Sequence, residues 1–286
     1  MLSSSLSDAA GELDQSFGYL ALGKKDHTLL LNRFTTDDIL TLMAQVGLTK
    51  HLGSLGFRDL KVNIIRDEAQ IYHLKIYHAA LNPENLLIDL RLSQSRYVPD
   101  RRLFTGDAAV LDMVMIEWFT AQHPGKTFDD GRPQLPGQSR PGLGCLGYMM
   151  ELMYLVGKTL LADGFMDVPD HFHGAVMYAR KFKFFDPVKE AILQAVLRDL
   201  KQFSLADLSW GFITKTILDR STGAPQEYEP SEQVFPLSRC MKDYFNSTAY
   251  RDRFIRVYQN KKFAFAYESM LERRKELLRT KKIEEL

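Results

Sequence analysis

Three glycines frame the segment with the clearest chemical signal in this 286-residue chain. Gly142, Gly144 and Gly147 lie in the stretch LPGQSRPGLGCLG, which opens directly into a long apolar run. Glycine lets a backbone bend sharply or approach a ligand closely, and a helix that begins at such a turn presents unpaired N–H groups and the positive end of its dipole. The segment therefore predicts a phosphate or pyrophosphate site. The alternative is that the small residues only let a helix cross a sheet closely.

The elements that follow the turn have a recognisable order. The apolar run predicts a buried core helix, and the segment GFMDVP (164–169) predicts a short strand. A second helix is expected in HFHGAVMYARKFKFF (171–185), which carries Tyr178. The turn is therefore expected at the start of a helix–strand–helix unit.

This order resembles the GNAT superfamily of acyl-CoA-dependent N-acyltransferases, over roughly residues 60 to 186. The matching residues outside the three glycines are Arg140 on the turn and Ala175, Tyr178 and Phe184 after it. The resemblance implies a GNAT-like sheet and a substrate that is acetyl-CoA or another acyl-CoA. It also implies that the pyrophosphate is held by the turn residues Gln138, Arg140, Gly142, Leu143, Gly144, Cys145 and Gly147.

Two side chains are candidates for proton transfer. Glu117 lies among apolar neighbours in DAAVLDMVMIEWFTAQ (107–122), a segment that predicts a buried central strand, with a helix as the alternative for its first half. It is either a general base with a raised pKa or a solvent-facing residue of a half-exposed strand. The resemblance implies that Tyr178 protonates the departing thiolate of CoA, and the alternative is that its ring packs in the core.

A cluster of Asp170, His171 and His173 opens the second helix. With His73 and His78 it suggests a metal site, but those two residues fall on opposite faces of a regular strand because their separation is odd. We instead expect Asp170 to cap the helix and the histidines to line the rim of a pocket. No metal is expected.

Composition sets limits on the class of protein. A net charge of +1 gives no general argument for nucleic acid or for a membrane surface. Two cysteines without metal or disulfide spacing favour a reducing compartment, so a cytoplasmic location is expected. Residues 251–286 carry a net charge of +5 around a spaced apolar stripe, which predicts a charged helix that docks on a partner or on a second copy of the chain.

Periodicity predicts the remaining elements. An amphipathic helix follows Thr35, and a helix begins near Pro187. Strands are expected at KVNII, IYHLKIY and NLLIDLRL, as an antiparallel meander, and at SWGFITKTILD (209–219). Helices are expected at VFPLSRCMKDYFNS (234–247) and from Phe263 to Leu286.

The sequence as a whole predicts an α/β fold with a GNAT-like mixed central sheet flanked by helices. A lead-in (1–33), an α/β domain (34–203) and an α-rich extension (204–286) are expected. The expected function is acyl transfer from acyl-CoA to a small-molecule or peptide amine. One alternative is a non-catalytic binding or regulatory protein with the same fold, because the motif spacing of the family is not met. Another is a metal-dependent hydrolase that uses His171 and His173.

Overall fold

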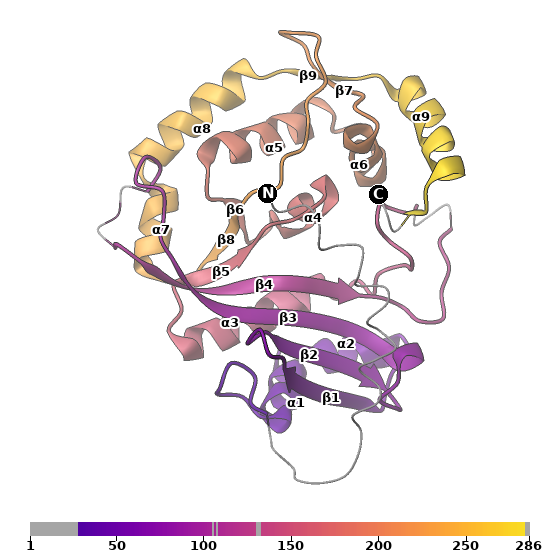
Figure 1. Ribbon diagram of the computed structural model, residues 1–286, viewed down its shortest axis with the longest axis vertical. Helices are drawn as coiled ribbons and strands as arrows, with labels where there is room; N and C mark the ends of the chain where they lie inside the picture. The colour runs from indigo at the N-terminus through magenta and orange to yellow at the C-terminus, as the bar shows by residue number, and fades with distance from the viewer. Residues whose placement is uncertain (1–27, 105, 107, 130–132, 284–286) are drawn as a thin grey trace.

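A computed structural model describes residues 28–283, except residues 105, 107 and 130–132 (Figure 1). The predicted lead-in falls mostly outside these described residues. Its last residues do not form a lead-in, because Leu30 and Leu31 are buried in the main core.

Four antiparallel strands form the first half of the sheet, in the order of the chain. They are β1 (Leu60–Arg66), β2 (Tyr72–His78), β3 (Leu86–Tyr97) and β4 (Leu111–Ala121), with a short 3₁₀ helix (Pro83–Asn85) before β3. Apolar and polar positions alternate along them, and Ile64 pairs with Leu74 while Ile76 pairs with Ile88. The predicted meander and the predicted strand within residues 107–122 are confirmed.

One face of these strands is covered by α1 (Thr36–Gln45), α2 (Leu48–Ser54) and α3 (Leu146–Leu160), which share a core with the strands. Thr35 and Asp38 form a capping box that starts α1, as the Thr-Thr-Asp-Asp sequence predicts. The apolar run becomes α3, and its Met149, Leu152 and Val156 are buried against the sheet. These predicted helices are confirmed.

The second half of the sheet is assembled from distant parts of the chain. The strand β5 (Gly164–Asp167) runs parallel to β4, β8 (Gln233–Pro236) pairs with β5, and β6 (Lys183–Phe184) closes the edge. A Cβ on Gly164 would lie 2.6 Å from the carbonyl oxygen of Phe235, so only glycine lets β5 and β8 pair here. The result is one seven-stranded mixed sheet, and the segment predicted as an extension supplies β8.

The remaining helices gather around the β5–β6 end of the sheet, where α5, α6, α8 and α9 form an arch in Figure 1. They are α4 (Phe172–Tyr178), α5 (Pro187–Asp199), α6 (Leu205–Ile213), α7 (Arg239–Asn246), α8 (Thr248–Asn260) and α9 (Tyr267–Thr280). A small second sheet pairs β7 (Ile217–Asp219) with β9 (Phe263–Phe265). Residues of α7 and α8 pack on Met166 and Val234, on the sheet face opposite to α3, so helices cover both faces and the predicted α/β class is confirmed.

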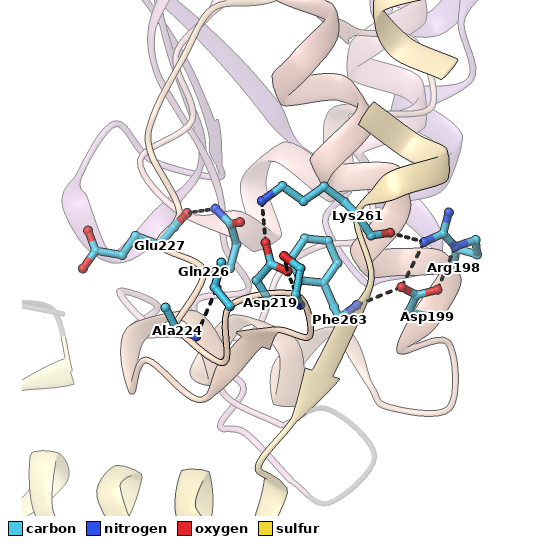
Figure 2. A network of polar contacts seen from close by, with 10 residues as sticks. Arg198, Asp199, Asp219, Ala224, Gln226, Glu227, Lys261 and Phe263 are labelled. Atoms are coloured by element: carbon cyan, nitrogen blue, oxygen red, sulfur yellow. Dashed lines mark hydrogen bonds and ion pairs between the residues drawn. The ribbon is translucent and has the colours of Figure 1, made fainter. Parts of the chain in front are cut away.

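A polar network holds the ends of α5 and α8 to the small sheet (Figure 2). The Arg198 guanidinium pairs with Asp199 and donates to the carbonyl oxygen of Lys261 at 2.7 Å. The Asp199 carboxylate accepts the N–H of Phe263 at 2.9 Å, and Lys261 bonds Asp219 at 2.5 Å. The hydrogen bonds that the Asp219 carboxylate accepts from Lys261 and Ser221 hold the pKa of this carboxyl at about 2.

The last helix packs on its own chain. Met270 of α9 is fully buried, the Arg274 guanidinium lies 4.8 Å from the centre of the Trp210 ring on α6, and Arg273 donates to the carbonyl oxygen of Thr214 at 2.8 Å. Leu271 and Leu278 remain exposed on the outer side. Docking of a partner through this helix stays a prediction.

Several predicted elements are wrong in type or extent. Residues 209–213 belong to helix α6, because a Ser204–Asp207 capping box starts a helix that is buried almost all round, and a short apolar run does not distinguish strand from helix. The helix predicted for 171–185 ends at Tyr178, and Lys183–Phe184 is an edge strand. Residues 233–236 form β8, and Ser238 caps α7 only afterwards. The terminal helix begins at Tyr267, after β9.

No helix within the described ranges is long and apolar enough to cross a bilayer.

Candidate functional site

The strands β4 and β5 stay paired for only three residues. The last parallel pair is Met115 with Met166. Beyond it, β4 contains a bulge, since Ile116 pairs with Leu92 of β3 and Trp118 with Arg91, which leaves Glu117 as the extra residue. A bulge bends its strand and increases the local twist, and bulges are common beside active sites. We call the place where the two strands separate, between residues 116–121 and the end of β5, the fork.

The edge of β4 that faces the fork lacks a strand partner among the described residues until residues 121–123, where the chain returns. There the Leu143 N–H donates to the carbonyl oxygen of Ala121 at 3.2 Å, and the His123 N–H donates to that of Pro141 at 2.8 Å. This return places the glycine turn and the start of α3 at the far end of the fork. The parallel strands and the helix between them therefore bring the turn and the end of β5 to one side of β4.

Asp167 is the last residue of β5 and lies at the base of the fork. Burial raises the pKa of its carboxyl to about 7, and the charges of Asp170 and Glu117 add to the increase. It faces Gln233 across the β5–β8 pair, and Gln233 donates its side-chain N–H to the carbonyl oxygen of Ala175 on α4 at 3.2 Å. A carboxyl group with this pKa can accept and release a proton near neutral pH.

The two predicted catalytic residues, Glu117 and Tyr178, differ in their exposure to solvent. The Glu117 side chain is exposed and accepts a hydrogen bond from the Ser93 hydroxyl at 2.5 Å. Tyr178 is 8% exposed and its ring packs against Phe182 in the main core. Burial, followed by the charge of Asp167, raises the pKa of Tyr178 well above 10. The charge of Glu117 thus raises the pKa of Asp167, and the charge of Asp167 raises the pKa of Tyr178.

The start of α3 presents free backbone donors. Cys145 is the N-cap residue and its side chain makes no capping bond, while the N–H groups of Leu146, Gly147 and Tyr148 donate to no protein acceptor in the part of the chain described. Gly144 has a φ of +67°, the left-handed conformation that favours glycine, and nothing lies within 4 Å of a Cβ built on Gly144 or Gly147. Unpaired amides, a helix dipole and open space are the requirements of an anion site.

The other predicted turn residues have structural partners. The Arg140 guanidinium donates to the carbonyl oxygen of Pro124 at 2.7 Å, across the turn, and the carbonyl oxygen of Gln138 accepts the side-chain N–H of Gln134. Leu143 and Cys145 are buried, and burial raises the pKa of the Cys145 thiol to about 12, so this cysteine stays a thiol. The candidate anion site thus consists of backbone rather than of these side chains.

His51 of α2 supports the turn from the other side. Its Nε2 lies 2.9 Å from the carbonyl oxygen of Leu143, and its ring stacks on Tyr148 at a centroid distance of 4.9 Å. The bond to a carbonyl oxygen assigns the proton to Nε2. Sequence reasoning did not identify His51, because only the fold brings α2 to the start of α3.

His171 lines a cavity, as expected, but His173 is buried and is not among the residues that line it, and Asp170 does not cap the helix. His171 is the N-cap residue and no side chain makes the capping bond. The cavity has a volume of about 250 Å³ and is lined by Asp170, His171, Ser209 and Tyr228 among others. Burial, followed by the charges of Asp167 and Asp170, raises the pKa of the Tyr228 hydroxyl.

The same histidines have no metal-site geometry in the structure. The rings of His171 and His173 stack at 5.2 Å, and His173 Nδ1 lies 2.8 Å from the Ser209 hydroxyl oxygen. Burial lowers the pKa of His173 to about 4, so its ring is neutral at pH 7. His73 pairs with Asp67 elsewhere. Within the described ranges, no group of three His, Cys, Asp or Glu side chains is arranged to hold a metal ion.

Sequence reasoning also missed Asp167. A signal was present, because an aspartate ends the apolar strand GFMD, and ligands of open α/β sheets bind beyond the carboxyl ends of parallel strands. The unusual pKa, however, depends on Asp170, Glu117 and the burial that only the folded chain provides.

No protein-family model matches the chain. No curated protein matches it either.

Proposed function

We propose that this protein binds an acyl-CoA and transfers its acyl group to an amine. The single observation that supports the proposal most strongly is the fork, which opens at the Glu117 bulge with Asp167 at its base and the uncapped start of α3 at its far end. A candidate anion site and a proton acceptor at opposite ends of one strand edge that has no strand partner among the described residues match the two ends of an extended nucleotide thioester.

In this proposal the pyrophosphate of CoA lies on the N–H groups of Leu146, Gly147 and Tyr148, where the dipole of α3 favours negative charge. The pantetheine arm carries amide groups, and the exposed edge of residues 116–121 offers backbone N–H and C=O groups to them, as a sheet edge does to an added strand. An arm that runs along this edge from the turn leads toward Asp167. The thioester therefore lies near the base of the fork.

The reaction then needs one group that accepts a proton from the amine and one group that stabilises the leaving thiolate. The amine nitrogen attacks the thioester carbonyl carbon, so a C–N bond forms and the C–S bond breaks. The nitrogen gives its proton to the Asp167 carboxylate, whose pKa near 7 suits transfer at neutral pH. The exposed Glu117 carboxylate attracts the incoming ammonium group, which loses one proton to water before the neutral amine attacks.

Tyr178 takes a different role from the one implied by the resemblance. Its pKa lies well above 10, whereas an ordinary thiol has a pKa of about 8.5, so complete proton transfer from the phenol to a thiolate is unfavourable. The phenol instead keeps its proton and donates a hydrogen bond to the developing thiolate, which takes its proton from the acid form of Asp167 or from water.

The substitution Gly147→Glu tests the binding half of the proposal. A glutamate in the first turn stabilises a helix through its dipole and replaces a poor helix former, so the unliganded variant should melt at the same temperature or higher. Its charge should repel pyrophosphate and remove the melting-temperature increase that acetyl-CoA gives the wild type. The matched control is Ala249→Glu, at the same position of α8, which should keep the increase. Unchanged acetyl-CoA binding in Gly147→Glu would contradict the proposal.

The second candidate is a protein that binds CoA without transferring an acyl group. The burial of Tyr178 in the core favours it, because a packed ring needs no catalytic role to explain it. The two candidates differ in one measurement. Release of free thiol from acetyl-CoA in the presence of primary amines, followed with a thiol reagent, supports the transferase, and CoA binding with no amine-dependent release supports the binding protein.

A further inference from the structure

A second cavity lies away from the fork, between β6, α5, α7 and α8. Its volume of about 580 Å³ is within the range of small-molecule sites, roughly 300–1,000 Å³. Four aromatic residues line it, namely Phe245, Tyr250, Phe254 and Tyr258. The rings of Phe254 and Tyr258 are stacked at 5.4 Å with an interplanar angle of 14°, and Arg198 holds the Tyr258 ring from behind at 4.4 Å. This wall suits the apolar part of a ligand.

The inner side of the cavity carries a buried carboxylate. Glu190 is 6% exposed, and its two oxygens accept hydrogen bonds from the Phe184 N–H at 3.0 Å and from the Gln194 side chain at 2.9 Å. These bonds satisfy the edge strand β6 and hold the carboxylate in place. A carboxylate has roughly four acceptor positions, so it retains capacity for a cationic ligand group.

Two basic side chains line the same cavity at its exposed side. Lys183 and Arg251 are exposed, and neither forms an ion pair in the part of the chain that the structure describes. Lys183 precedes Phe184, the residue whose N–H binds Glu190. Burial raises the pKa of the Glu190 carboxyl, while its hydrogen bonds and the charge of Lys183 oppose that increase and favour the carboxylate. Opposite charges are therefore close together, with the negative charge inside and the positive charges outside.

We propose that this cavity binds a free α-amino acid with an apolar side chain. The ammonium group meets Glu190, the carboxylate meets Lys183 and Arg251, and the side chain lies on Phe254 and Tyr258. A free α-amino acid carries both an ammonium and a carboxylate, and the lining of this cavity carries a group of opposite charge for each of them. A ligand with only one of the two charges leaves the other charged group of the protein without a partner and binds more weakly. This inference does not depend on the proposed transferase activity.

Three matched probes test the proposal by calorimetry and thermal unfolding of the full chain. These are L-phenylalanine, L-phenylalaninamide, which lacks the carboxylate, and 3-phenylpropionate, which lacks the ammonium group. L-Phenylalanine at about ten times its Kd should raise the melting temperature by about 2–5 °C. Each of the other two should bind at least about tenfold more weakly, the order expected for one lost charged contact.

Variants then locate the site. Lys183→Gln and Arg251→Gln change exposed side chains, so both should fold, and each should weaken L-phenylalanine binding about tenfold. Arg256→Gln, an exposed arginine on the same helix as Arg251, is the control and should bind normally. The proposal is overturned if L-phenylalanine does not bind, if all three probes bind equally, or if the double variant Lys183→Gln/Arg251→Gln binds as the wild type does.

Discussion

The carboxylate of Asp167, at the end of β5, acts on the hydroxyl of Tyr178, at the end of α4, and raises the pKa of that phenol beyond the effect of burial. The last residues of the strand and of the helix that follow the glycine turn are thus one acid and one phenol. Asp167 exchanges its proton near neutral pH, whereas Tyr178 keeps its proton throughout the range in which proteins are stable. Four tests depend on this arrangement and on the fold that supports it.

Replacement of Asp167 by asparagine should change how stability depends on pH. The pKa of Asp167 is about 7 in the folded protein and about 3.9 in an unfolded chain. The protonated form therefore favours the folded state, with its full contribution below pH 4 and a progressive loss as the pH rises through 7. Asn cannot ionise, so Asp167→Asn should gain stability relative to the wild type, by about 1 kcal/mol or more at pH 8. Thermal unfolding from pH 4 to 9 checks this, and a difference independent of pH contradicts the raised pKa.

The same variant should lose turnover while it keeps its substrate. Loss of a general base costs roughly 10²–10⁴-fold in rate, and acetyl-CoA affinity should change little because the pyrophosphate lies at the other end of the fork. Asp170→Asn is the informative companion, since it removes one charge that raises the pKa of Asp167. In that variant the rise of kcat/KM with pH should shift to lower pH. Full activity of Asp167→Asn excludes Asp167 as the base.

Removal of the Tyr178 hydroxyl tests the proposed hydrogen bond to the leaving sulfur. Tyr178→Phe keeps the ring that packs on Phe182, so the fold should remain intact. A lost hydrogen bond to a charged atom predicts a decrease in kcat of about 10- to 100-fold with little change in the Kd of acetyl-CoA. An unchanged kcat assigns Tyr178 to the core alone. The phenol control is Tyr228→Phe, whose hydroxyl bonds the carbonyl oxygen of Pro169.

Truncation of the tail should show that it belongs to the core. A chain that ends at residue 262 lacks Phe263 and Met270, both fully buried, and loses the bond from the Phe263 N–H to Asp199. We expect it to be recovered unfolded or with a melting temperature many degrees lower, since two large core side chains together contribute several kcal/mol. A chain that ends at residue 280 keeps α9 and should fold. If both truncated chains melt normally, the tail is an appendage, as a partner-docking helix requires.

The sequence was sufficient for the elements whose patterns are local. The alternation in β1–β3 and the four-residue spacing after Pro187 gave strands and a helix at the observed places. Apolar runs such as residues 209–213 did not predict the correct element. Helix α6 is buried almost all round, so its apolar pattern has no single face. The two-residue strand β6 could not be predicted either, because it depends on distant partners. These are β8 and the side chains of Glu190 and Tyr250.

The candidate site likewise has one part that the sequence predicted and two parts that it did not. The glycine turn was visible because it depends on the backbone of a few consecutive residues, and the structure describes an uncapped helix start there. The bulge at Glu117 was not visible, since it is a relation between β3 and β4. Asp167 was not visible as a proton acceptor, because its pKa depends on burial and on charges from two other segments.

The most direct test of the central claim is to titrate isotope-labelled protein with CoA and follow its backbone amides by NMR. Binding of the pyrophosphate at the start of α3 predicts the largest chemical-shift changes at Gly144, Leu146, Gly147 and Tyr148, followed by residues 116–121 along the edge of β4. Pantetheine, which lacks the pyrophosphate, should shift only the second group. If CoA leaves the amides of residues 144–148 unchanged, or shifts only residues away from the fork, the proposed site is wrong.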